Sequence, residues 1–325
     1  MKAARFRLVS IFATLAAATA AAISVSACNE ENIASPMIDG SLALQYAQGN
    51  YDLGPRVFRT EGAAKSAEWI EKQAVEMPGL LESGGKVRIV GAGPVKNVEI
   101  ILPTTVCKPV QETDVDFIVI GAHHDTKVLF DSPGFAGAND GASGVGALLA
   151  MARACVESMQ TRPLPCGIRF VFFDGEEALY QYTDTDGLVG SRVYVDMLRR
   201  DGNLKHCRAM VLLDMIGDKD LHIELAGNST QSLAKLVLNA AKGLGHVNKF
   251  SAGTTPMIDD HYPFLQVGIP AVDFIDFDFG PDNSYWHTKE DTMDKISADS
   301  IKTAADVALR TVWLFAENGF QDLSK

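Results

Sequence analysis

Five short clusters hold the acidic and histidine side chains of this chain that could bind a metal or move a proton. Four of them follow runs of apolar residues, and another opens a helix-like stretch: 123–125 (His-His-Asp), 137–141 around Asp140, 174–177, 214–218 and 285–288. Taken singly, each has an ordinary structural explanation, because acids at a helix start are usually caps and paired glutamates usually face solvent. Their meaning therefore depends on whether the fold brings them together.

The strands and helices predicted around these clusters indicate that the fold brings the clusters together. Continuous apolar runs predict buried strands at 116–121, 167–173, 209–213 and 270–277. Strands covered on one side are predicted at 86–90 and 98–102, and helices at 61–77, 141–156, 190–200, 229–243 and 297–318. Alternating strands and helices predict an α/β fold, a three-layer sandwich with a central, mostly parallel twisted sheet flanked by helices.

In such a sheet, ligands bind outside the carboxyl ends of the strands, which is where the clusters fall. Carboxylates brought together there repel one another strongly unless a cation neutralises them. Zinc suits a site of imidazole and carboxylate ligands, and the chain has no Cys-x-x-Cys pair that would indicate a thiolate site instead. The sequence therefore predicts a zinc enzyme.

The clusters, taken in order, resemble the site of the co-catalytic zinc aminopeptidase superfamily. Within that superfamily, the chain looks more like the glutaminyl cyclases of the animal type, also called type II. The motifs that carry this closer resemblance are His-His-Asp-Thr-Lys at 123–127, Phe-Phe-Asp-Gly-Glu-Glu-Ala at 172–178, Leu-Val-Gly-Ser-Arg at 188–192, Leu-Leu-Asp-Met-Ile-Gly at 212–217, Asp-Asp-His-Tyr-Pro-Phe-Leu at 259–265 and Trp-His-Thr at 286–288.

The resemblance implies a role for each matching residue. Asp140, Glu177 and His287 would bind zinc, and Glu176 would be the general base that shuttles a proton. Asp214 and Asp259 would form a carboxylate hydrogen-bond network with Glu176, and Trp286 would line the substrate pocket. In the aminopeptidase branch, His123 and Asp214 instead hold a second zinc, and Asp140 bridges the two ions. One zinc is therefore expected, and two are possible.

Three positions bear on the choice between the two branches. Asp259 favours the cyclases, because the peptidases usually carry a small residue there. Tyr182 stands roughly where animal cyclases have a pocket tryptophan, and Ile258 stands where they have glutamine. The first hypothesis is a glutaminyl-peptide cyclotransferase that acts on peptide or protein N-termini. The alternatives are a zinc aminopeptidase and an inactive, peptide-binding surface lipoprotein.

The N-terminus predicts export. Three basic residues precede an apolar, alanine-rich stretch at 8–25, as in a secretory signal peptide. The sequence Val-Ser-Ala-Cys at 25–28 resembles the lipobox of bacterial lipoproteins, which implies that Cys28 is lipidated. We expect a signal peptide at 1–27, a tether at 28–41 and one catalytic domain at 42–325. The protein would be a periplasmic or cell-surface lipoprotein that touches the membrane only through its lipid.

Charge and cysteine content narrow the partners and the redox setting. The formal net charge is −12, and the predicted signal peptide carries three of the basic residues and no acid. A chain with this net negative charge is a poor partner for nucleic acid, because the phosphate backbone is also negatively charged. Four cysteines remain after Cys28, and one or two disulfides among them are expected in an oxidising compartment: Cys107, Cys155, Cys166 and Cys207. The sequence does not choose their pairing. We expect a monomer.

Overall fold

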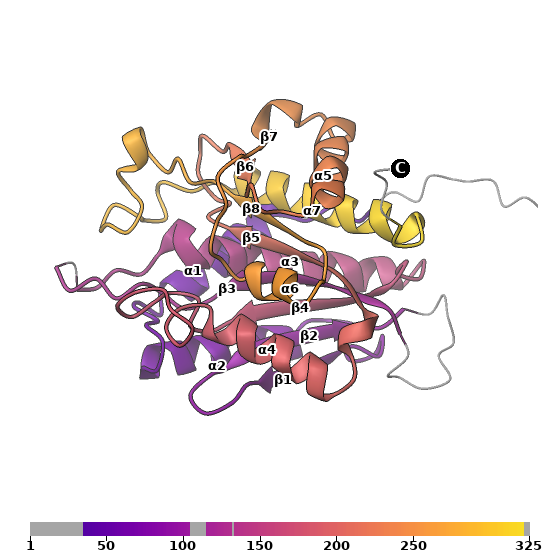
Figure 1. Cartoon of the computed structure of the whole chain (residues 1–325), viewed down its shortest axis with the longest axis horizontal. Coiled ribbons are helices and arrows are strands. Elements are labelled where there is room, and N and C mark those ends of the chain that lie inside the picture. Colours follow the sequence, from indigo (N-terminus) through magenta and orange to yellow (C-terminus); the bar gives the residue numbers. More distant parts are fainter. Residues whose placement is uncertain (1–34, 105–114, 132, 322–325) are drawn as a thin grey trace, which may run out of the picture. The chain divides into compact units, whose positions relative to one another are not determined.

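The computed structural model describes residues 35–104, 115–131 and 133–321. Eight strands in these ranges form one mixed sheet (Figure 1). The strand order is β1-β2-β4-β3-β5-β8-β6-β7. Their bounds are β1 Lys86–Val90, β2 Asn97–Leu102, β3 Phe117–His123, β4 Gly167–Phe173, β5 Cys207–Asp214, β6 Ile223–Leu225, β7 Phe250–Ala252 and β8 Ala271–Ile275.

The four strands at the centre of the sheet, β4, β3, β5 and β8, run parallel to one another. The flanking strands β2 and β6 pair with them in the antiparallel sense. All seven residues of β3 are buried, because helices cover both faces of a parallel sheet. The predicted α/β fold is therefore confirmed. The three-residue strands β6 and β7 were not predicted, since three residues show no recognisable periodicity.

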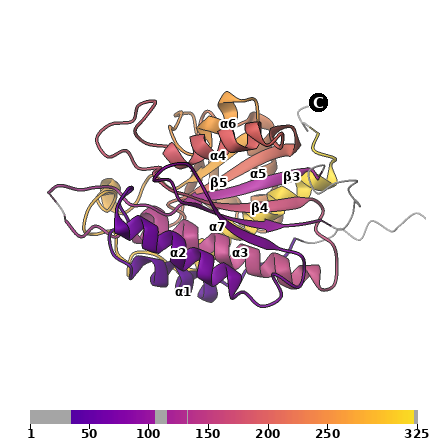
Figure 2. The same ribbon diagram turned by 90° about the horizontal axis from the view of Figure 1, so that it is seen from below.

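Helices cover the two faces unequally (Figure 2). One face packs against α1 Gly40–Tyr51, α2 Glu61–Val75, α3 Gly144–Met159, α5 Gln231–Gly243 and α7 Ala298–Glu317, and the other against α4 Val189–Arg200 and the short α6 Tyr262–Gln266. Alternate residues of β3 divide between the two cores: Ile118 and Ile120 face the five-helix side, whereas Phe117 and Val119 face α4 and α6. This two-residue alternation is the geometry of a strand buried on both sides.

The residues just before α1 are packed against α7. Asp39 caps α1 by accepting hydrogen bonds from the backbone N–H groups of Ser41 and Leu42. The Ile38 N–H donates to Asp306 at 2.8 Å, and Lys302 donates to the Ile38 carbonyl at 2.8 Å. The helix thus begins inside the range predicted as a tether. The predicted signal peptide and Cys28 lie outside the described residues, and within the described ranges no helix has the length and apolar character of a membrane span.

The three described cysteines, Cys155, Cys166 and Cys207, are free thiols buried in the two cores. Burial raises the pKa of the Cys166 and Cys207 thiols to about 12. They behave as small apolar core residues, so the expected disulfides are not formed among these three. Cys107 lies outside the described residues.

Candidate active site

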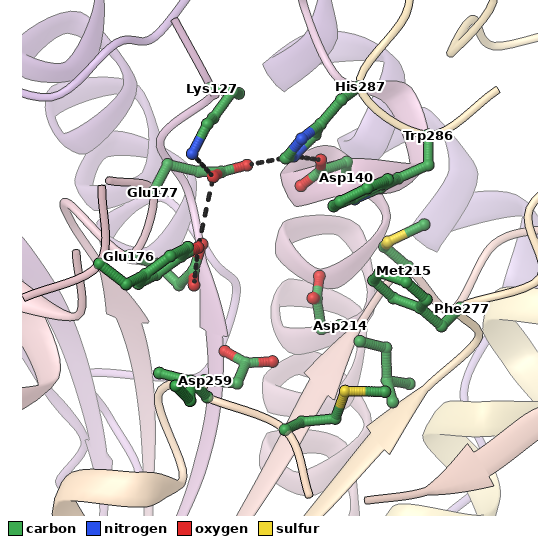
Figure 3. A pocket seen from close by; sticks show the side chains of 14 residues that line it. Lys127, Asp140, Glu176, Glu177, Asp214, Met215, Asp259, Phe277, Trp286 and His287 are labelled. Carbon is green, nitrogen blue, oxygen red and sulfur yellow. Dashed lines mark hydrogen bonds and ion pairs between the residues drawn. The ribbon is translucent and has the colours of Figure 1, made fainter. Parts of the chain in front are cut away.

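Eight of the predicted site residues line one pocket at the carboxyl ends of the central strands, whereas His123 lies outside its lining and Cys28 outside the described residues (Figure 3). Its volume is about 400 Å³. It is lined by Lys127, Asp140, Glu176, Glu177, Tyr182, Asp214, Met215, Met257, Ile258, Asp259, Ile275, Phe277, Trp286 and His287. Strands β3 and β4 end level with each other, with His123 opposite Phe173, so the segments that follow them enter the same pocket.

Asp140, Glu177 and His287 converge on one point in the lining of this pocket. His287 Nε2 lies 2.9 Å from Glu177 Oε1 and 3.2 Å from Asp140 Oδ2. One ligand atom of each residue lies within 4.8 Å of the other two. Two carboxylates and one imidazole, open to the pocket on one side, form the kind of donor set that catalytic zinc uses. The residues present therefore fit the predicted ion.

A second group lies on the other side of Asp140. His123 Nε2 is 3.2 Å from Asp140 Oδ1 and 3.2 Å from Asp214 Oδ1. These three residues also bring one ligand atom each within 4.8 Å of one another. Asp140 thus turns one oxygen to each group, as a carboxylate that bridges two ions would. The structure brings together all five residues that the sequence offered as ligands.

The backbone around Asp140 adopts a turn that only glycine allows at two points. Gly137 has φ 53° and Gly141 has φ 103°, and a Cβ on Gly137 would lie 2.0 Å from the Asp140 carbonyl oxygen. Asp291 holds this turn by accepting the backbone N–H of Asn139 at 2.7 Å and of Asp140 at 3.1 Å. Sequence reasoning missed Asp291, whose only local signal is its position four residues after His287.

Arg56 supports the same turn and was also missed. Its side chain is fully buried and donates to the carbonyl oxygens of His124 at 2.9 Å, Ala136 at 2.7 Å and Gly137 at 3.3 Å. A buried guanidinium among carbonyl groups ties the segment after β3 to the segment before Asp140. No local pattern around residue 56 indicates this contact.

Asp125 positions Glu176, the predicted general base, and Glu177, a predicted zinc ligand, at the same time. Its two carboxylate oxygens accept the backbone N–H of Glu176 at 3.1 Å and of Glu177 at 3.2 Å. Gly175, at φ 69°, lets the chain turn between β4 and these glutamates. Lys127 donates to Glu177 Oε2 at 3.1 Å, which leaves Oε1 of that ligand facing His287.

Glu176 is buried on the opposite wall from Trp286 (Figure 3). Burial, followed by the charges of Glu177 and Asp259, raises the pKa of Glu176 well above 4.5. A carboxyl group with a raised pKa can both take up and release a proton near neutral pH. Among the described residues, one hydrogen-bond donor reaches its side chain, the Tyr182 hydroxyl at 2.9 Å from Oε1.

Asp214 and Asp259 line the pocket below Glu176, but their hydrogen bonds go elsewhere. Asp214 Oδ1 lies 3.2 Å from His123 Nε2, and Asp259 Oδ1 accepts the backbone N–H of Asp260 at 2.6 Å. Burial and then the charge of Asp273 raise the pKa of Asp259 well above 3.8. The predicted hydrogen-bond network with Glu176 stays a prediction.

Aromatic residues form the remaining wall. Trp286 stacks on the His287 ring with centroids 4.0 Å apart, and its indole lies 4.8 Å from the Phe277 ring. Tyr182 lies across the pocket from them. Ile258 is 60% exposed at the rim, so it offers an apolar edge but no hydrogen bond from its side chain. One wall is therefore acidic and the other is apolar.

Comparison with known proteins gives consistent matches. Residues 105–312 match the model of peptidase family M28. A crystal structure of a glutaminyl cyclase from an Acidobacteriales bacterium superposes with a TM-score of 0.77 at 32% identity, covering 88% of this chain and 97% of that one. A Zn-dependent exopeptidase from Parabacteroides distasonis superposes with a TM-score of 0.69 at 25% identity, covering 86% and 99%.

The curated relatives match over a shorter region. The glutaminyl-peptide cyclotransferase of the snake Boiga irregularis is 27% identical over 224 residues, which are 58% of this chain and 60% of the relative. The match thus spans about six tenths of that relative's length.

Proposed function

The chain belongs to peptidase family M28, and from this premise we propose that it is a zinc-dependent glutaminyl-peptide cyclotransferase. Its substrates would be peptides or proteins with an N-terminal glutamine, and its products pyroglutamyl peptides and ammonia. The observation that carries the proposal is the similarity to a bacterial glutaminyl cyclase over 97% of that protein's length. The pocket supports it, because Asp259 lies beside Glu176 opposite an aromatic wall.

In the proposed reaction, the α-amine nitrogen of the substrate attacks its own glutamine γ-carbonyl carbon. Zinc held by Asp140, Glu177 and His287 would supply Lewis acidity toward that carbonyl. Glu176 takes a proton from the amine as the new C–N bond forms. It then returns this proton to the amide nitrogen, whose bond to carbon breaks, and ammonia leaves. Because attack is intramolecular, the enzyme needs to orient the glutamine rather than bring two molecules together.

The apolar wall suits this orientation. Trp286 and Phe277 offer ring faces to the methylene groups of a folded glutamine side chain. The acidic wall opposite them offers acceptors to the amine. A pocket of about 400 Å³ is large enough for one residue and the start of the next.

A zinc aminopeptidase is the second candidate, favoured by one specific observation. His123, Asp140 and Asp214 form a second group of possible ligands, beside a structural similarity to a Zn-dependent exopeptidase. In that reaction, a water molecule attacks the first peptide bond, and Glu176 again accepts the proton.

Mass spectrometry separates the two candidates. The purified protein is incubated with one peptide that begins with Gln and one that begins with Leu. Loss of ammonia from the Gln peptide alone supports the cyclase. Stepwise loss of N-terminal residues from either peptide contradicts it and supports the aminopeptidase.

We also propose that the protein is exported and anchored by a lipid on Cys28. The support is the sequence pattern at 1–28. Expressed in a bacterial host, the wild-type chain should fractionate with membranes, whereas a Cys28→Ser chain should not carry the lipid. Equal fractionation and equal mass of the two chains would contradict the anchor.

A further inference from the structure

The Tyr182 hydroxyl meets the proposed general base directly. Its oxygen lies 2.9 Å from Glu176 Oε1 and 3.5 Å from Glu177 Oε2. Within the described residues, no other donor bonds the Glu176 side chain, so this hydroxyl alone determines which oxygen stays free. A phenol O–H bonded to one carboxylate oxygen leaves the other oxygen to accept a proton.

The Tyr182 ring is held tightly in place. Gly187, at φ 79°, packs beneath it, and a Cβ there would lie 2.4 Å from Tyr182 Cδ1 and 2.7 Å from Cε1. Lys127 Nζ lies 5.2 Å from the ring centroid. The ring therefore packs against a glycine that makes room for it and lies near a cation that attracts its face.

The loop that carries Tyr182 is fixed by one carboxylate. Asp186 accepts three consecutive backbone N–H groups, those of Leu179 at 2.7 Å, Tyr180 at 2.9 Å and Gln181 at 3.1 Å. Its own carbonyl accepts the N–H of Thr183 at 2.9 Å. Residues 179–183 are thus tied to Asp186 on both sides of Tyr182, although the loop is at the surface.

We propose that Tyr182 is a positioning residue that fixes Glu176 for proton transfer, and that Asp186 acts through Tyr182 by holding its loop. The inference rests on the proposed role of Glu176 as the base, which the cyclase and the aminopeptidase reactions share. Tyr182 keeps its own proton throughout. Glu176 takes a proton from the substrate amine, or from water, on Oε2 and returns it to the leaving nitrogen.

The first test replaces only the hydroxyl, with Tyr182→Phe. The ring and its packing against Gly187 stay, so a purely structural role leaves the activity unchanged. We expect kcat to fall roughly 10- to 100-fold, the loss of one hydrogen bond to a charged group, with KM within about twofold and zinc content unchanged. A kcat equal to that of the wild type overturns the proposal.

The second test asks whether Asp186 acts through Tyr182. In Asp186→Asn, an NH₂ group replaces one of the two carboxylate oxygens, so at least one of the three backbone N–H groups loses its acceptor. We expect kcat to fall in this variant, and the double variant with Tyr182→Phe to be no slower than Tyr182→Phe alone. Effects that multiply would overturn the role of Asp186. Asp184→Asn, an exposed acid in the same loop, is the matched control and should keep wild-type kcat.

The outcomes separate this inference from the proposed function. If the wild type removes N-terminal residues and releases no ammonia, the cyclase proposal fails, and the same variants are compared on the peptidase reaction. If it turns over neither peptide, a crystal structure of the wild type decides. A separation beyond 3.5 Å between Tyr182 Oη and Glu176 Oε1 there overturns the inference, and one near 2.9 Å supports it.

Discussion

Asp140 presents its two carboxylate oxygens in different directions, one toward His287 and the other toward His123. Because the same residue belongs to both groups of possible ligands, the arrangement is compatible with one ion or with two. Glu176 and Glu177 are neighbours in the chain with different surroundings. Glu177 contacts the side-chain nitrogens of Lys127 and His287, whereas Glu176 contacts the Tyr182 hydroxyl and faces the buried acids. These different environments are the reason for proposing Glu177 as the ligand and Glu176 as the base.

Glu176→Gln should separate these two roles. Gln keeps the size of the side chain but cannot carry the proton, so we expect turnover to fall by at least about 100-fold with zinc content intact. The measurement is ammonia or amino acid release together with metal analysis of the purified variant. Glu177→Gln is the matched control and should lose zinc. Loss of zinc from Glu176→Gln would mean that Glu176 is a ligand rather than the base.

Asp174 should make stability depend on pH in a defined direction. Burial and the charge of Asp125 raise its pKa to about 7, against about 3.9 in an unfolded chain. The native state therefore favours the protonated acid, and the stability from this group is present below pH 4 and lost as pH rises toward 7.

Asp174→Asn removes this dependence, because an amide group does not titrate. The hydrogen bond is kept, since the amide oxygen can still accept the Lys96 N–H. The free energy of unfolding of the variant, relative to the wild type, should rise between pH 5 and pH 8, on the order of a few kcal/mol. Urea unfolding at both values measures it. A difference that does not change with pH would contradict the raised pKa.

At the scale of elements, the site residues are positioned by parallel strands that end level with one another. His123 ends β3, Asp214 ends β5, and Glu176 follows β4 after a short turn. Residues far away in the chain hold the loops that follow these strands. The side chains of Asp125, Arg56 and Asp291 do so through hydrogen bonds to the backbone of the loops. These supports are buried, so each lost bond leaves an unpaired backbone group.

Asp291→Ala should therefore cost both stability and metal affinity. It leaves the buried N–H groups of Asn139 and Asp140 without an acceptor, each costing about 1–3 kcal/mol. Zinc affinity should weaken roughly 10- to 100-fold, as it does when a group that supports a ligand is removed. Urea unfolding and zinc titration measure the two effects. Asp294→Ala, an exposed acid in the same loop, should change neither.

At the scale of the whole molecule, the sheet is buried between two apolar cores, and the acids of the site are gathered around one pocket at the carboxyl ends of its central strands. A rigid sheet cannot move these acids apart to relieve their repulsion. The folded chain therefore holds a concentration of negative charge that a bound divalent cation would stabilise. The unfolded chain has no such concentration of charge.

Removal of zinc should thus lower the melting temperature. At a zinc concentration about 1,000 times Kd, binding adds about 4 kcal/mol, which corresponds to roughly 5 to 15 °C in a domain of this size. Calorimetry with and without a chelator measures the shift, and native mass spectrometry counts the ions. Glu177→Gln should show little response to the chelator. An unchanged melting temperature in the wild type would contradict the zinc site.

The sequence by itself determined the six longer strands, the helices α2, α3, α4, α5 and α7, and the five chemical clusters, because each depends on neighbours in the chain. Apolar runs give buried strands, and short motifs such as Glu176-Glu177 give the site chemistry. Only the tertiary structure decided which backbone groups Asp291 and Arg56 hold, and that Tyr182 bonds Glu176 rather than merely lining the pocket. Asp291 lies 151 residues from Asp140. No local periodicity encodes such a contact, since it exists only after the sheet has brought distant loops to one edge.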